Sequence, residues 1–163
     1  MNEPNLEPAR VLLAAGDAAG LAALRPARET LDAFAVAWTE TVATTTGVGS
    51  LELAEMRAVI VASADAALPD AFAAATDRPV VRVPVAEADR AGITLLYEPA
   101  TKDLPAADAP FATVAIGEAG AKNAALFVVS VLALDDPSLW AQWLAFRQRQ
   151  TEAVLASPPL SMD

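Results

Sequence analysis

Short apolar segments alternate with longer segments of helical periodicity along the chain. Continuous apolar runs are typical of buried strands, and five segments have this character: Val11–Ala15, Val36–Ala43, Ala58–Ala62, Pro79–Val85 and Phe111–Ile116. Because the expected strands are apolar along their whole length and are separated by helices, the pattern predicts a parallel sheet with helices on both faces. Ligands of such folds bind beyond the carboxyl ends of the strands, so the turns after these segments are candidate sites.

The expected helices lie between these strands and after the last one. A helix over Ala18–Phe34 should start near Pro26 or break there, because proline lacks an N–H and clashes with the preceding turn. The pair Asp136-Pro137 provides an N-cap and a first-turn proline for the final helix. The other helices are expected over Ala66–Thr76 with Pro69 in its first turn, Leu51–Met56, Ala119–Leu134 and Pro137–Leu155.

The length of 163 residues suits one compact domain. We expect a flexible N-terminal segment over 1–8, a single α/β domain over 9–157 and a tail over 158–163. The N-terminus lacks the apolar core of a secretory signal. The longest nearly unbroken apolar run, Ala124–Leu134, is too short to span a bilayer as a helix. These features predict a cytoplasmic protein that does not enter a membrane.

The charge balance excludes some classes of partner. The chain carries 11 basic and 21 acidic residues, for a net charge of −10. A nucleic-acid partner would require a basic face, so we expect none. A single local pocket can still oppose the global charge and hold a small anionic ligand. The 55% hydrophobic content also favours an oligomer.

The chain contains no cysteine and no histidine. Thiolate nucleophiles and zinc–thiolate sites are therefore excluded. Catalytic pairs of serine or cysteine with histidine are excluded as well. The side chain that most often moves protons near neutral pH is also missing.

The last third of the chain resembles a known family. The stretches Ala112–Leu126 and Phe146–Leu155 resemble the last strand, loop and C-terminal helices of the carboxyaminoimidazole ribonucleotide mutases, also called the AIR carboxylase catalytic-subunit or PurE-type family. Two weaker matches support this resemblance. Ala9-Arg10-Val11 followed by Gly16 resembles the first strand of the family, and Pro79–Val85 resembles its fourth strand.

This resemblance implies a flavodoxin-like three-layer α/β/α sandwich and an octamer in which each C-terminal helix packs on a neighbouring subunit. It also implies a purine-biosynthesis reaction that moves a carboxyl group on an aminoimidazole ribonucleotide, without a metal or organic cofactor. In the family a histidine within a Gly-Gly-Ala-Ala-His-Leu-Pro-Gly loop is the central proton-transfer group.

Three loops depart from the family pattern. Where the family has Gly-Ser-x-Ser-Asp, this chain has Gly16-Asp17-Ala18-Ala19-Gly20, and Asp17 would repel a phosphate by about 4 kcal/mol at about 4 Å and an effective dielectric near 20. Alternatively, Asp17 caps the following helix. The Ser-Ala-His-Arg loop becomes Thr44-Thr45-Thr46-Gly47, and the histidine loop is shortened to Ala62–Asp70 with alanine before Leu68.

These comparisons define a vestigial ligand cleft with no catalytic residue assigned. Its predicted members share a position at or just after a strand end and are Gly16, Asp17, Thr44, Thr45, Thr46, Ser63, Asp65, Gly117 and Lys122.

The main functional hypothesis is a catalytically inactive homologue with a structural, partner-binding or ligand-sensing role, assembled with itself or with an active paralogue. The alternative is an active mutase, or a related carboxylase or decarboxylase, that moves protons with Asp17, Asp65 or Lys122. Two further options are a divalent cation held by Asp17, Asp65 and Glu118, and an anion held by Lys122 and Arg82. Ordinary caps and ion pairs explain these side chains better, and we predict no metal or cofactor.

Overall fold

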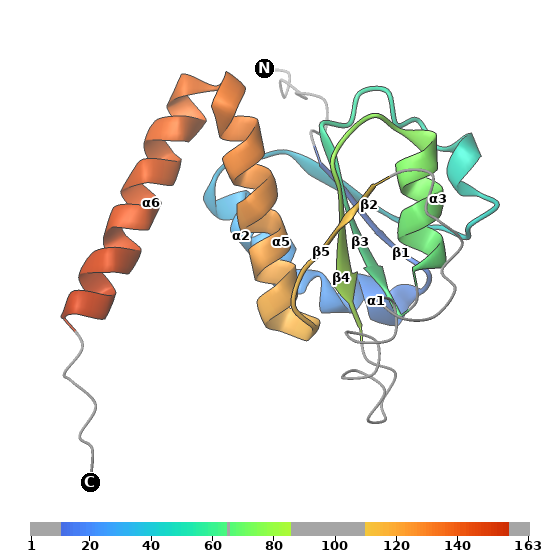
Figure 1. The fold of residues 1–163 in the computed structure, drawn as a ribbon, viewed down its shortest axis with the longest axis horizontal. Coiled ribbons are helices and arrows are strands. Elements are labelled where there is room, and N and C mark those ends of the chain that lie inside the picture. Colours follow the sequence, from blue (N-terminus) through green and yellow to red (C-terminus); the bar gives the residue numbers. More distant parts are fainter. Residues whose placement is uncertain (1–10, 65, 86–109, 157–163) are drawn as a thin grey trace, which may run out of the picture.

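The sheet contains five parallel strands in the order β2–β1–β3–β4–β5 (Figure 1). The computed structural model describes residues 11–64, 66–85 and 110–156. This strand order is the flavodoxin-like one, and helices cover both faces, so the predicted α/β/α class is confirmed. The strands are β1 Val11–Ala15, β2 Trp38–Val42, β3 Ala58–Ser63, β4 Val80–Pro84 and β5 Ala112–Thr113.

The register places the carboxyl ends of the strands along one edge of the sheet. Ala15 at the end of β1 lies opposite Val42 of β2 and Ala62 of β3. Ser63 lies opposite Pro84 at the end of β4. The loops that follow these strands therefore emerge side by side, which is the condition for a shared ligand site.

Each face of the sheet has its own core. On one face, α2 (Arg25–Ala33) and α5 (Gly117–Leu132) bury the side chains of Leu13, Ile60 and Val81. On the other face, α3 (Ala67–Ala75) and the 3₁₀ turn η1 (Val48–Ser50) cover the second core cluster, which includes Phe72, Leu12, Val59, Val61 and Val80.

The last helix, α6 (Pro137–Leu155), extends away from the sheet beyond α5 (Figure 1). Asp136 caps it as expected, because its Oδ1 accepts hydrogen bonds of 3.0 Å from the N–H groups of Ser138 and Leu139. The ring of Phe34 lies 5.5 Å from that of Phe146, which holds the middle of α6 against the domain. Most of the remaining α6 surface is exposed.

Several predicted elements are altered. The first helix is divided at Leu24 into α1 (Ala18–Ala23) and α2, with Pro26 in the first turn of α2, as proline requires. The expected helix over Leu51–Met56 is absent, and the chain there forms bends and turns. The edge strand β2 is polar rather than apolar, and none of its residues is fully buried.

Among the residues that the structure describes, one helix meets the length and composition of a membrane span. It runs over Gly117–Asp135, and its mean hydropathy is 1.3. Seven α5 residues are buried in the core against the sheet and α2. The apolar character of α5 is thus explained by its position over the sheet.

Candidate functional site

A cleft of about 680 Å³ opens at the carboxyl edge of the sheet. It combines the loops after β1, β2, β3 and β4 with the start of α5. Its lining residues are Gly16, Asp17, Ala19, Gly20, Ala23, Ala43, Thr44, Thr45, Ala62, Ser63, Ala64, Ala67, Leu68, Val85, Ile116 and Gly117. The structure therefore brings together six of the nine predicted residues: Gly16, Asp17, Thr44, Thr45, Ser63 and Gly117.

Asp17 lies at the mouth of the cleft and caps α1. Its Oδ1 accepts a hydrogen bond of 2.7 Å from the N–H of Gly20. The backbone of Asp17 is extended, as an N-cap residue requires. The capping role considered for this carboxylate is confirmed, and one of its oxygens is occupied by the helix rather than by a ligand.

The loop after β2 is a self-bonded threonine turn. The Thr44 carbonyl accepts the N–H of Gly47, and the Thr44 and Thr46 hydroxyl oxygens lie 3.3 Å apart. Thr44 and Thr45 line the cleft, whereas Thr46 does not. The turn places hydroxyl groups near the cleft, and these groups donate and accept hydrogen bonds but do not titrate near neutral pH.

The loop after β3 forms the opposite wall. Ser63 is 7% exposed and ends β3, and Ala64, Ala67 and Leu68 continue the lining. Asp65 lies outside the described residues, so its predicted place in the cleft stays a prediction. The alanine side chains make this wall largely apolar.

The start of α5 closes the cleft from the β5 side. Gly117 has a φ of +71°, a left-handed conformation that glycine adopts without steric cost. Ile116 gives α5 no side-chain cap. The first N–H groups of α5 therefore have no side-chain acceptor, and such helix starts favour anions.

Lys122 is separated from the other predicted residues. It lines a second pocket, of about 520 Å³, between α2, α5 and α6. The periodicity of α5 turns this side chain away from the cleft that Gly117 lines. The placement of Lys122 in the ligand cleft is therefore corrected.

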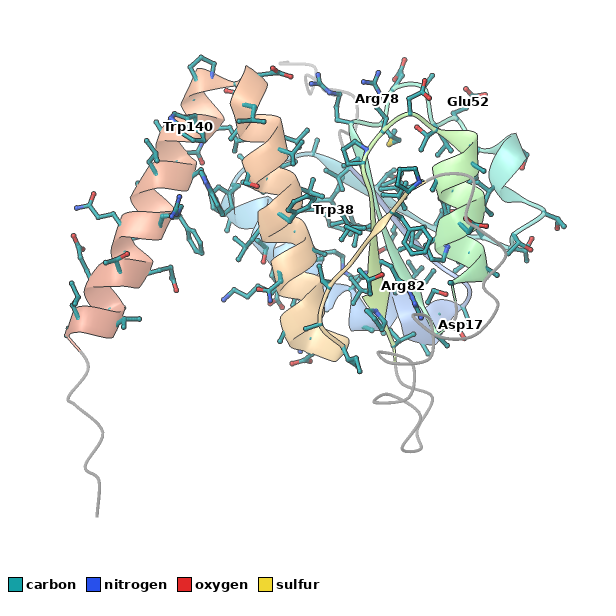
Figure 2. All side chains as sticks on the ribbon, in the orientation of Figure 1. Asp17, Trp38, Glu52, Arg78, Arg82 and Trp140 are labelled. Carbon is teal, nitrogen blue, oxygen red and sulfur yellow. The ribbon has the colours of Figure 1, made fainter. Side chains whose placement is uncertain are left out.

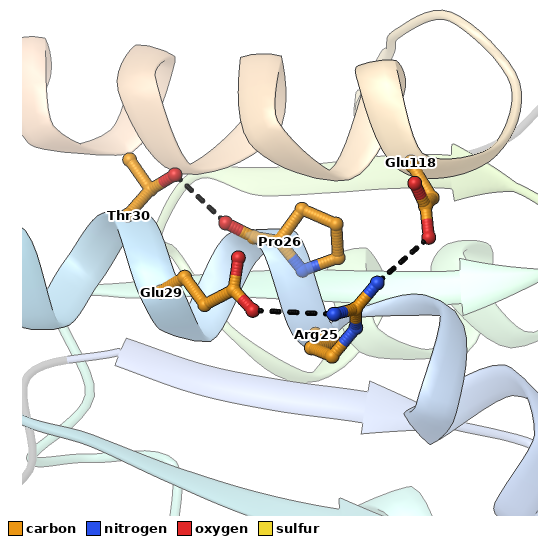
Figure 3. Close-up of polar contacts among 5 residues, drawn as sticks. All are labelled: Arg25, Pro26, Glu29, Thr30 and Glu118. Atoms are coloured by element: carbon orange, nitrogen blue, oxygen red, sulfur yellow. Dashed lines mark hydrogen bonds and ion pairs between the residues drawn. The ribbon is translucent and has the colours of Figure 1, made fainter.

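Glu118 is engaged in a surface ion-pair group. Its Oε1 lies 3.0 Å from Nη2 of Arg25, whose Nη1 lies 3.5 Å from Glu29 (Figure 3). Nearby, the hydroxyl of Thr30 donates to the carbonyl of Pro26. Within the described ranges, no group of three or more aspartate or glutamate side chains is arranged to hold a metal ion. The cation option for Asp17 and Glu118 therefore has no geometric support there.

Arg82 was considered as part of an anion site with Lys122, but the structure buries it inside the sheet. It lies within β4 and is 2% exposed, so it is not a surface cation at the strand end. Its Nη2 donates a hydrogen bond of 2.8 Å to the carbonyl of Ala64, which lines the cleft. The sequence did contain a signal for this burial, namely a charged residue inside an otherwise apolar strand. Such a residue is buried only with polar partners, so a nearby acceptor was to be expected.

The cleft is thus a mostly apolar site with a few hydroxyl groups, at the carboxyl edge of a flavodoxin-like sheet. This fold and the position of the cleft define the class of the protein. Comparison with known proteins identifies the family. The AIR carboxylase family model matches residues 10–153, and the chain belongs to that family.

Curated proteins that are similar to this chain are mutases. The N5-carboxyaminoimidazole ribonucleotide mutase of Vibrio vulnificus (strain CMCP6) is 42% identical over 107 residues, which cover 64% of this chain and 65% of the relative. The mutase of Escherichia coli (strain K12) is 41% identical over 102 residues, covering 61% of this chain and 59% of the relative. The chain thus matches just under two thirds of the length of these relatives.

A solved structure supports the fold. Treponema denticola PurE superposes with a TM-score of 0.70 and 13% identity, covering 89% of this chain and 93% of that one. At this identity the likeness concerns the fold alone.

Proposed function

We propose that this protein acts on an aminoimidazole ribonucleotide or a close analogue, as a mutase or a related carboxylase or decarboxylase with altered site residues. The observation that carries the proposal is the cleft at the carboxyl ends of β1, β2, β3 and β4, in a chain whose curated relatives are mutases. Ligands of open parallel sheets bind at this edge. No cofactor is needed in this proposal, in keeping with the chemistry that the resemblance implies.

The cleft offers distinct surfaces to the two ends of such a ligand. The start of α5 at Gly117 provides backbone N–H groups, which suit a phosphate or carboxylate. The hydroxyl groups of Thr44, Thr45 and Ser63 suit the ribose or the polar edge of a heterocycle. The alanines of the β3–α3 wall suit the flat face of a ring.

Proton transfer in this proposal relies on a carboxylate. The chain has no histidine, and Asp17 is the one titratable side chain among the described residues that line the cleft. Asp17 lines the cleft and caps α1 through Oδ1, which leaves Oδ2 as the oxygen for proton transfer in this proposal. Asp65 is the second candidate, and Lys122 drops out because it lines the other pocket.

A second candidate function is binding without turnover, as a ligand-sensing, partner-binding or structural homologue. The complete absence of histidine favours it, because the proton donor implied by the family resemblance has no equivalent here. Alanine, Ala67, stands before Leu68 where that donor is expected, and Thr46 stands at the histidine position of the second loop. The enzyme and the ligand sensor both place a small anionic ligand in the same cleft.

One experiment separates the two functions. Purified protein is assayed for carboxyl transfer on the aminoimidazole nucleotide, and the affinity of the nucleotide is measured by calorimetry. Saturable turnover supports the enzyme, and binding without turnover supports the sensor. Absence of both would exclude the cleft as a site for this ligand class.

A matched pair of variants ties the result to the cleft. Ala19 and Ala22 are both exposed residues of α1, but only Ala19 lines the cleft. Ala19→Glu adds negative charge beside the ligand, and we expect it to weaken binding by about tenfold or more. Ala22→Glu has the same helix propensity and should leave binding unchanged.

Assembly and location are part of the same proposal. We infer self-association through α6, which exposes Trp140 and Leu144, with an octamer as the state that the resemblance implies and an active paralogue as an alternative partner. Exposed apolar side chains on one helix favour an interface. The mutase relatives are purine-biosynthesis proteins by the family resemblance, so we place this protein in the cytoplasm.

A further inference from the structure

Arg82 occupies a position where an apolar residue would be expected. All five residues of β4 are buried, and Arg82 is 2% exposed. Its side chain lies on the sheet face opposite to that of Val81 and Val83, because side chains alternate along a strand. Burial of a guanidinium costs several kcal/mol unless hydrogen bonds satisfy it. Its retention in the middle of a short strand calls for a specific contact.

The contact lies at the cleft wall. Nη2 of Arg82 donates a hydrogen bond of 2.8 Å to the carbonyl oxygen of Ala64, directly after β3. Ser63 and Ala64 both line the cleft. Figure 2 shows Arg82 and Asp17 toward the same end of the sheet, whereas Arg78 lies at the opposite end.

The residue after β4 makes a second hydrogen bond to the end of β3. The N–H of Val85 donates to the carbonyl of Ser63 over 3.3 Å. The end of β3 is thus held by the backbone through Ser63 and by a side chain through Ala64. The side-chain bond reaches one residue beyond the sheet, where the ladder no longer constrains the chain.

We infer that Arg82 is a positioning residue that holds the β3–α3 segment at Ala64 in the conformation that forms one wall of the ligand cleft. Charge-assisted hydrogen bonds are about twice as strong as neutral ones, so Arg82 holds this carbonyl more firmly than a neutral donor would. The planar fork of arginine also fixes its direction, which an ammonium group does less well. The effect of Arg82 on ligand affinity rests on the proposed function, but its effect on the wall does not.

The test compares Arg82→Met and Arg82→Lys with Arg78→Met. Arg78 is an exposed arginine just before β4, so its substitution removes the same charge away from the cleft. Two quantities are measured in each folded variant. The first is the hydrogen–deuterium exchange of the backbone over 62–68, and the second is the affinity of the aminoimidazole nucleotide.

We expect exchange over 62–68 and the dissociation constant to rise by about tenfold in Arg82→Met, the loss typical of one charge-assisted hydrogen bond. Arg82→Lys should show smaller changes in the same direction, and Arg78→Met none. Arg82→Lys decides the question by itself if the methionine variant does not fold. Unchanged exchange over 62–68, or exchange raised equally throughout the chain, would overturn the inference. If the wild-type protein does not bind the nucleotide, the proposed function fails, and the exchange still decides the role of Arg82.

Discussion

The carboxylate of Asp17 accepts the N–H of Gly20 over 2.7 Å at the mouth of the cleft. This bond gives one residue two opposed effects. The carboxylate stabilises the start of α1, and its charge disfavours an anionic ligand in the space that it lines. Substitution can separate the two effects.

Asp17→Asn should keep the cap and remove the charge, because asparagine caps helices as well as aspartate does. We expect an unchanged melting temperature and nucleotide affinity that rises by about tenfold, less than the limit set by an unscreened pair. If Asp17 is the proton-transfer group, turnover falls while affinity rises. Calorimetry and the carboxyl-transfer assay measure the two quantities. Unchanged affinity in this variant would show that the carboxylate does not face the ligand.

Asp17→Ala should remove both effects. Loss of an N-cap costs about 1 kcal/mol, and the melting temperature of a chain of this size should fall by about 2–4 °C. Thermal unfolding followed by circular dichroism measures the change. An equal fall in the asparagine variant would contradict the capping argument.

Gly120 allows α5 to approach the strand end closely. A Cβ at this position would overlap the carbonyl group of Ala115, and backbone cannot give way as a flexible side chain can. We expect Gly120→Ala to destabilise the protein by about 2 kcal/mol or more in urea unfolding. Gly49→Ala is the control, since a Cβ there meets no atom within 4 Å, and it should be neutral or slightly stabilising.

The aromatic cluster of Phe34, Trp143 and Phe146 anchors α6. The ring of Phe146 lies 5.5 Å from Phe34 and 5.8 Å from Trp143. Phe146→Ala should therefore cost about 2–3 kcal/mol, below the range for a fully buried ring because Phe146 is only partly buried. Tryptophan fluorescence during urea unfolding reports the change near Trp143. Arg147→Ala, on the exposed side of α6, should have little effect on the same signal.

The exposed face of α6 should control assembly. Trp140 and Leu144 are 40% and 46% exposed and lie one helical turn apart. The double variant Trp140→Ser and Leu144→Glu should shift the mass measured by light scattering toward the monomer, with unchanged circular dichroism. Ala141→Glu adds the same charge on an exposed neighbouring position and should leave the mass unchanged. A wild-type protein that is already monomeric would contradict the assembly proposal.

The sequence predicted the secondary structure best where local chemistry is strong. The strand at Val11–Ala15 and the helix over Pro137–Leu155 occur at the predicted residues, because an apolar run and a proline after an aspartate cap are local signals. The helix expected over Leu51–Met56 was wrong. A short apolar segment has no decisive period, and here Leu53 is buried from an irregular segment rather than from a helix.

The sequence predicted which loops form the cleft, but it predicted less well where individual side chains point. Residues directly after β1, β2 and β3 meet at the cleft because parallel strands end at one edge. The helical period separates Lys122 from Gly117, but the pocket that Lys122 lines depends on how α5 packs on α2 and α6. The buried contact of Arg82 likewise requires a partner eighteen positions away in the chain.

By itself, the sequence determined the α/β class, the succession of the five strands along the chain, and the absence of any imidazole or thiol. Those properties follow from the pattern and identity of single residues. Only the tertiary structure decided that Asp17 caps α1 while lining the cleft, that Lys122 faces another pocket, and that Arg82 reaches Ala64. Each of these contacts joins groups whose distance depends on the packing of whole elements, and packing is a property of the folded chain rather than of any local segment.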